Sequence, residues 1–172
     1  RFILLLCLVL ALLTINFNGN NASQVFFGQT TMSRKVPIYY VNTPEKKVAI
    51  SFDAAWGADK TEKIMEICKD YGVFATFFLV GFWVEDYPQI AKKIADNGFE
   101  IGTHSNTHPD MTKLSIGQMK EELNASLNII KNTTSYEPRL FRAPYGAYND
   151  TLIDVCNSLN LKTIQWDFFT AK

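Results

Sequence analysis

From residue 36 onward, short apolar runs alternate with longer segments whose apolar residues recur every three or four positions. The apolar runs predict buried strands, and the longer segments predict amphipathic helices. This alternation is typical of βα units around a parallel sheet, so the expected fold class is α/β. Either an open doubly wound sheet or part of a barrel fits the pattern. We expect strands at 47–53, 73–80, 98–103, 139–142 and 161–168, and helices at 61–71, at 88–95, from 115 onward and at 150–159.

Local signals predict the ends and the buried faces of two of these helices. Gly72 is expected directly after the end of the first helix, because glycine readily adopts the left-handed conformation found there. Ser115 and Gln118 form the pattern of a capping box that opens the long helix. The residues expected to face the core are Ile64, Ile67, Cys68 and Tyr71 in the first helix and Met119, Leu123, Leu127 and Ile130 in the long one.

The N-terminal part has a different composition. Arg1 precedes an apolar run from Phe2 to Phe17. This run is shorter than the roughly 20 residues that a membrane-spanning helix needs, so residues 1–17 indicate a signal peptide or a membrane anchor, cut short at its start. Residues 18–35 are rich in Asn, Ser, Gln and Thr and indicate a polar tether. We therefore expect a domain at 36–172, outside the cytoplasm, and incomplete at its C-terminus because the sequence ends shortly after the fifth strand.

Charge and cysteine content exclude some classes of function. The 17 basic and 17 acidic residues balance, and no basic stripe favours nucleic acid as a partner. The three cysteines are Cys7, Cys68 and Cys156. An odd number, with Cys68 and Cys156 inside expected helices, predicts buried thiols and no disulfide framework.

The two histidines of the chain, His104 and His108, lie four positions apart. Such a pair is often two ordinary surface or core residues, but imidazoles are also common metal ligands. Their context favours a site, because His104 follows a buried strand and Pro109 disfavours helical geometry at His108. Asp53, Arg142 and Asp167 also lie at the ends of expected strands. Since the carboxyl ends of parallel strands share one rim, we expect Asp53, Arg142 and the two histidines to converge there.

Four stretches carry a family resemblance: Ser51-Phe52-Asp53, Ala75-Thr76-Phe77-Phe78, His104-Ser105-x-x-His108, and Phe141-Arg142-Ala143-Pro144-Tyr145-Gly146. In this order and spacing they resemble the polysaccharide deacetylases, the NodB homology domains of carbohydrate esterase family 4. The motif from Phe52 to Gly57 resembles the branch linked to bacterial sporulation. The resemblance covers about 36–168. It implies a distorted (β/α) barrel that removes acetyl groups from an N-acetylated cell-wall polysaccharide, either peptidoglycan or a chitin-like glycan.

The resemblance also implies roles for single residues. His104 and His108 would hold a divalent metal, with zinc as the expected ion. Asp53 would be the general base, and Arg142 would pair with it and orient it. Pro144 and Tyr145 would contribute to substrate and oxyanion binding, the latter through its backbone N–H. These roles suit amide hydrolysis, in which a metal activates water and N–H donors stabilise the developing oxyanion.

The sequence departs from the family pattern at two places. Members usually carry a second Asp directly after the first, as the third metal ligand, but Ala54 stands here. Asp53 itself or Asp59 is then a candidate for the third ligand. The later family motifs that supply the general acid have no counterpart; Trp166-Asp167 approaches one, but Phe169 stands where an Asp is expected. A catalytically silent glycan-binding relative is therefore the alternative to the metal-dependent hydrolase.

The remaining aromatic residues are expected either in the core or at the rim of the sheet. Trp56 and Tyr145 are expected either in the core or at the rim, where aromatic rings would stack on sugars. Trp166, Phe77 and Phe78 are expected in the core. The chain lacks the Gly-x-Ser-x-Gly motif of α/β hydrolases, so that class is not favoured.

Overall fold

Five short parallel strands form the centre of the computed structural model, which describes residues 33–167. The expected α/β class is confirmed. The strands are β1 (Ser51–Ala54), β2 (Thr76–Leu79), β3 (Glu100–Thr103), β4 (Leu140–Phe141) and β5 (Lys162–Thr163). The helices are α2 (Thr61–Asp70), α3 (Gly81–Asp86), α4 (Pro88–Asp96), α5 (Ile116–Thr134) and α6 (Asp150–Ser158), with 3₁₀ turns η1 (Met111–Lys113) and η2 (Pro144–Gly146).

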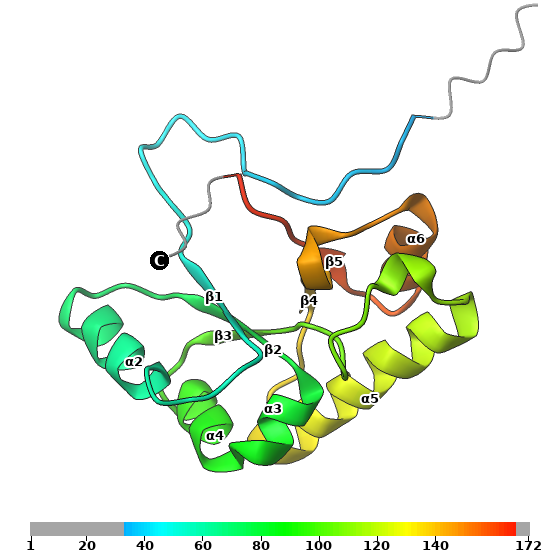
Figure 1. Cartoon of the computed structure of the whole chain (residues 1–172). Helices are drawn as coiled ribbons and strands as arrows, with labels where there is room; N and C mark the ends of the chain where they lie inside the picture. Colours follow the sequence, from blue (N-terminus) through cyan, green and yellow to red (C-terminus); the bar gives the residue numbers. More distant parts are fainter. Residues whose placement is uncertain (1–32, 168–172) are drawn as a thin grey trace, which may run out of the picture. The chain divides into compact units, whose positions relative to one another are not determined.

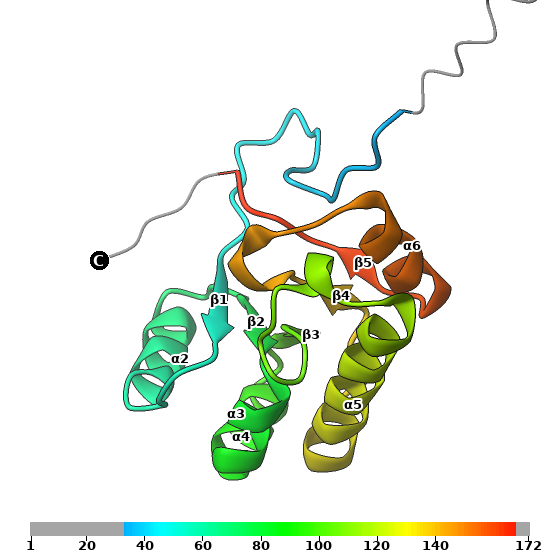
Figure 2. The ribbon, with the colours of Figure 1, turned by 45° about the vertical axis from the view of Figure 1, so that its right-hand side comes forward.

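The strand order decides between the two architectures that the sequence left open. The strands follow one another as β1-β2-β3-β4-β5, and every pair is parallel. Each crossover therefore advances in the same direction, as in a barrel wall, whereas a doubly wound sheet reverses its order at a switch point. Helices α2, α4 and α5 lie along one face of the sheet (Figures 1 and 2). Beyond β5, Ile38 forms a parallel bridge with Ile164.

Two apolar clusters fill the space between the strands and the helices. The first lies between β1–β3 and helices α2–α4 and contains Phe77 and Trp83, each at most 1% exposed. The second joins α5, α6 and β4 and contains Leu123 and Phe141. Helix α3, which the sequence did not predict, contributes Trp83, whose indole N–H donates to the Gly57 carbonyl over 2.7 Å. A helix of six residues is too short to show a periodic pattern in the sequence.

Helix termini follow the predicted signals. Gly72 has φ +64° and directly follows Tyr71, the residue that caps the C-terminus of α2. At the start of α5, the Gln118 N–H donates to the Ser115 hydroxyl oxygen and the Gln118 side chain accepts from the Ser115 N–H, so the capping box is confirmed. Of the predicted core residues of α5, Leu127 is only half-buried.

The predicted inner face of the first helix was partly wrong. Thr61, Met65 and Cys68 are buried, at positions i, i+4 and i+7. Ile67 and Tyr71 are 46% and 81% exposed. Successive helical residues are about 100° apart around the helix axis. A face that includes Ile67 is therefore turned away from the face that packs against the sheet.

All five strands begin later than predicted, and the first two show the largest differences. The first begins at Ser51, and Val48 is 88% exposed. The second begins at Thr76, and Phe74 is 83% exposed. Apolar composition alone does not separate a strand from the exposed segment that leads into it. The predicted fifth strand is also shorter and ends at Thr163, followed by the bridge at Ile164.

The predicted leader at 1–17, most of the tether and Cys7 lie outside the described residues. Within 33–167, no helix is both long enough and apolar enough to cross a membrane. Cys68 and Cys156 are buried free thiols, as expected. Burial raises the pKa of the Cys156 thiol to about 12, so this thiol is protonated at neutral pH.

Two phenylalanines in the same segment provide a test of the core. We expect Phe77→Ala to lower the free energy of unfolding by about 3–5 kcal/mol, because it leaves a cavity in the first cluster. The matched change Phe74→Ala should alter it by less than about 0.5 kcal/mol, because Phe74 is 83% exposed. Urea unfolding of both variants measures the difference. Equal losses would contradict the observed strand boundary.

Candidate active site

His104 lies in the site, directly after the end of β3. Its backbone N–H donates to the Leu79 carbonyl over 2.8 Å, which continues the pairing of β3 with β2. Its ring Nδ1 lies 2.7 Å from the Arg142 carbonyl oxygen. A carbonyl only accepts, so the neutral ring carries its proton on Nδ1 and leaves an electron lone pair on Nε2. Burial of the ring lowers the pKa of His104, although the nearby Asp53 charge opposes this shift.

His108 closes a tight loop over the same place. Its ring lies 4.9 Å from the His104 ring, centroid to centroid. Its backbone N–H donates to the Ser105 hydroxyl over 3.0 Å. Burial lowers the pKa of His108 as well, so both histidines are neutral at neutral pH. Its Nδ1 atom is buried and has no hydrogen-bond partner within the described part of the chain.

Asp53 and Arg142 form an ion pair between β1 and the end of β4. Arg142 Nη1 donates to Asp53 Oδ1 over 2.8 Å, and Nη2 donates to the Ser51 hydroxyl over 2.9 Å. The Arg142 guanidinium carbon lies 4.1 Å from the centre of the Phe78 ring. The second carboxylate oxygen of Asp53, Oδ2, lies 3.9 Å from His104 Nε2. Arg142 therefore holds one oxygen of Asp53 and leaves the other facing the histidines.

Aromatic side chains surround this group at a pocket of about 400 Å³. Trp56 and Tyr145 are 76% and 71% exposed, and their rings lie 5.9 and 4.8 Å from the His108 ring. Trp166, predicted to lie in the core, is only half-buried and lines the pocket as well. It is not in the core because the chain after β5 runs along the rim, where Trp166 lies against Gly146.

The structure brings together most of the predicted site residues. Asp53, His104, His108 and Tyr145 all line one pocket, and Arg142 reaches it through Asp53. Pro144 is buried at the start of η2, between Ala143 and Tyr145, which do line the pocket.

The ligands present do not complete a metal site of the kind that the family resemblance implies. Two neutral imidazoles suit zinc, and Asp53 Oδ2 is near them. Among residues 33–167, however, no three His, Cys, Asp or Glu side chains form a group able to hold an ion. The residues after Asp53 are Ala54, which packs partly against the first apolar cluster, and Ala55, which lines the pocket. Asp59 is exposed and does not line that pocket.

Sequence reasoning gave no role to three residues that shape the site. Ser51 shares one face of β1 with Asp53 and accepts the second Arg142 hydrogen bond. Phe78 is buried, as predicted, but it also lies against the guanidinium. Gly102 is opposite Phe78 in the β2–β3 register, and a Cβ there would lie 2.4 Å from the Phe78 ring. A polar residue two positions before Asp53 was the available signal for Ser51, since alternate strand residues share a face.

Comparison with known proteins identifies the family. The family model for polysaccharide deacetylase matches residues 40–164. The chain belongs to the polysaccharide deacetylase family.

Similar members of the family include enzymes and a pseudoenzyme. YlxY of Bacillus subtilis is 40% identical over 130 residues, which are 76% of this chain and 41% of YlxY. The peptidoglycan-N-acetylmuramic acid deacetylase PdaA of Bacillus subtilis is 32% identical over 129 residues, 74% of this chain and 49% of PdaA. The crystal structure of a family 4 pseudoenzyme from Bacillus anthracis has a TM-score of 0.74 and 35% identity, covering 76% of this chain and 47% of that one. The chain thus spans about half or less of the length of these relatives.

The lowered pKa values of both histidines predict a loss of stability in mild acid. An unfolded histidine has a pKa near 6.5, so below about pH 6.5 the unfolded chain binds more protons than the folded one. The free energy of unfolding should therefore be constant above this pH and fall as the pH drops below it. Asp53 and the hydrogen bond to the Arg142 carbonyl oppose the lowered pKa of His104, whereas His108 and the Arg142 charge reinforce it.

Thermal unfolding of metal-free protein at pH 7.5 and pH 5.5 measures this effect. His104→Gln is the control, and its melting temperature should change less between the two pH values. Equal melting temperatures of the unaltered protein at both pH values would contradict the prediction.

Proposed function

We propose that this chain recognises an N-acetylated cell-wall glycan and that, as it stands, it hydrolyses the glycan little or not at all. The observation that carries the proposal is the pair of alanines after Asp53. Ala54 packs partly against the first apolar cluster and Ala55 lines the pocket, and neither side chain has an oxygen that could join His104 and His108 as a metal ligand. The similarity to the Bacillus anthracis pseudoenzyme supports the same conclusion.

The rim of the pocket supports glycan binding. Trp56 and Tyr145 are largely exposed, and the ring of each lies close to the His108 ring. Flat aromatic faces beside hydrogen-bonding groups suit sugar rings, which have apolar C–H faces and polar edges. Peptidoglycan is the favoured glycan, because PdaA by its name deacetylates peptidoglycan.

A metal-dependent deacetylase remains the second candidate, favoured by the position of Asp53. Its Oδ2 atom lies 3.9 Å from His104 Nε2, so Asp53 and the two histidines would be the residues that hold a zinc ion. Bound zinc would polarise the acetyl carbonyl and acidify water. If Asp53 serves instead as the general base, the two histidines would hold the ion, Asp53 Oδ2 would take a proton from water, and Arg142 would keep Oδ1 in place. The Tyr145 N–H would stabilise the oxyanion, and Pro144 would fix the backbone before it.

We propose that the domain acts outside the cytoplasm, exported or held at the membrane by residues 1–17. The apolar run at 2–17 and the cell-wall substrates in the names of relatives support this location. Fusing residues 1–35 to a reporter that is active only after export tests this location, and an inactive reporter would count against it.

The motif from Phe52 to Gly57 supports a role in sporulation. Unchanged spores after deletion of the gene would count against that role.

The two candidates differ in what Ala54→Asp should do. For the silent glycan binder, we expect this variant to bind zinc roughly 10–100-fold more tightly than the unaltered chain, because a carboxylate adds both a ligand and a charge. Isothermal titration with zinc measures both affinities. Ala55→Asp is the matched variant, since Ala55 lines the same pocket. A gain in Ala55→Asp alone would mean that the ligand position is 55.

Glycan assays complete the distinction. We expect the unaltered chain to bind an N-acetylated peptidoglycan fragment without measurable acetate release, and Trp56→Ala to bind it about five- to tenfold more weakly through lost apolar contact. Acetate release by the unaltered chain, together with zinc affinity equal to that of Ala54→Asp, would refute the silent binder and establish Asp53 as the third ligand. Absence of glycan binding would refute both candidates for this chain.

A further inference from the structure

The loop that carries the histidines has an unfavourable backbone conformation. Ser105 and His108 have φ values of +68° and +59°, in the left-handed region that side chains other than glycine disfavour. The imidazoles meet only in this conformation, because it turns the chain back within four residues. Some other contact must therefore compensate for the strain.

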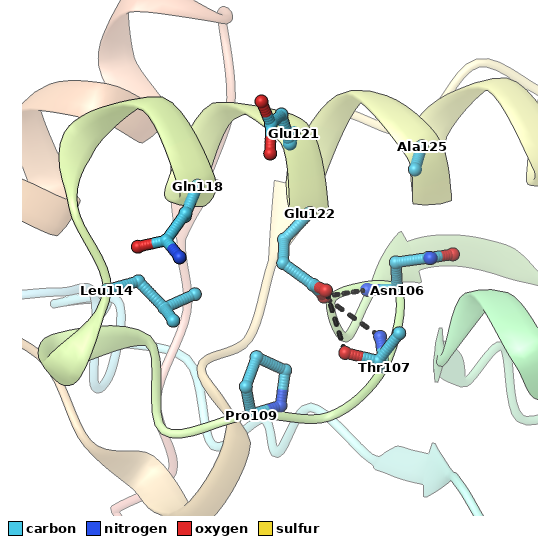
Figure 3. Close-up of a pocket in the computed structure, with 8 residues that line it drawn as sticks. All are labelled: Asn106, Thr107, Pro109, Leu114, Gln118, Glu121, Glu122 and Ala125. Atoms are coloured by element: carbon cyan, nitrogen blue, oxygen red, sulfur yellow. Dashed lines mark hydrogen bonds between the residues drawn. The ribbon is translucent and has the colours of Figure 1, made fainter.

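Packing behind the loop does not provide that compensation. A second pocket, of about 350 Å³, lies between the loop and α5. Asn106, Thr107 and Pro109 form part of its wall (Figure 3). The opposite wall is the first half of α5, which supplies Gln118, Glu121 and Glu122. Apolar side chains do not fill the space, so the loop is held by specific polar contacts.

Glu122 supplies the largest set of these contacts. Its Oε2 accepts hydrogen bonds from the backbone N–H groups of Asn106 and Thr107, over 2.9 and 2.8 Å. Its Oε1 accepts from the Thr107 hydroxyl over 2.7 Å. Figure 3 shows the Glu122 side chain pointing from α5 across the pocket to the loop. The neighbouring Glu121 side chain points away from the loop. One carboxylate thus pairs two of the three backbone N–H groups between the histidines.

Helix α3 holds the loop from another side. The N–H groups of Gly81 and Phe82 donate to the carbonyls of Ser105 and Asn106, over 3.0 and 3.2 Å. The approach is close, because a Cβ at Gly81 would lie 2.1 Å from Asn106 Oδ1. Helix α3 therefore binds the carbonyls of Ser105 and Asn106, whereas Glu122 binds the N–H groups of Asn106 and Thr107, so the two partners fix different groups of the same turn.

We propose that Glu122 is a positioning residue for the histidine pair, acting through Asn106 and Thr107 and not by contact with a ligand. The inference rests on the proposed function, because the two histidines that Glu122 positions line the pocket proposed to bind the glycan. Glu122 selects the strained turn because it binds two consecutive N–H groups and a hydroxyl, which point to one place only in that turn. Its role depends on hydrogen-bond acceptance, which a glutamine can largely retain.

Three variants test this role: Glu122→Leu, Glu122→Gln and the matched control Glu121→Leu. Without ligand, we expect amide hydrogen exchange at Asn106 and Thr107 to be at least tenfold faster in Glu122→Leu, and the imidazole ¹⁵N resonances of His104 and His108 to shift. In the Ala54→Asp background, the same change should weaken zinc binding by about tenfold or more. Glu122→Gln should restore both properties to within about threefold, and Glu121→Leu should alter neither.

The outcomes separate this inference from the proposed function. Unchanged exchange and imidazole spectra in Glu122→Leu, or equal losses in Glu122→Gln, would overturn it. If Ala54→Asp binds no zinc, the account of Ala54 fails, and exchange and spectra alone decide the role of Glu122. If Glu122→Leu does not fold, Thr107→Val, which removes one of the three hydrogen bonds, should give a smaller change of the same kind, and its absence would likewise overturn the inference.

Discussion

The arrangement of the site depends on the placement of one guanidinium. The Arg142 side chain is 6% exposed and lies between Asp53 on β1 and the Phe78 ring on β2, while its carbonyl receives the His104 Nδ1–H that follows β3. A buried cation is stable only when it is paired, so the sheet must close far enough to bring β1 within reach of the end of β4. Parallel strands in sequential order meet this requirement with all their carboxyl ends on one rim. The geometry of the site is thus largely a consequence of accommodating Arg142.

The sequence predicted the parts of this arrangement that have a local cause. The alternation of strands and helices, the capping box at Ser115 and the turn at Gly72 each depend on residues close together in the chain. The convergence of Asp53, Arg142 and the histidines was also predictable, because strand ends share a rim in any parallel sheet. The strand order was not, since it depends on how successive crossovers pack and both architectures have the same local pattern.

The errors also have physical causes. Phe74 and Val48 are exposed, although their composition suits a strand, because burial depends on where the covering helices end. Trp166 was expected in the core because large aromatic residues usually lie there, yet it lines the pocket. The contribution of Glu122 could not be predicted from the sequence around the histidines, because Glu122 lies 16 residues after Asn106 and 15 residues after Thr107.

The ion pair between Asp53 and Arg142 has a consequence for what the presence of Asp53 indicates. Asp53 neutralises a guanidinium that is almost completely inside the fold, so its loss would leave an unpaired charge there. This carboxylate is therefore required for folding whether or not it also acts in catalysis. Ala54 forms no such ion pair and packs only partly against the first apolar cluster, so the fold places less demand on its position. The presence of Asp53 is thus a sign of structural constraint as much as of activity.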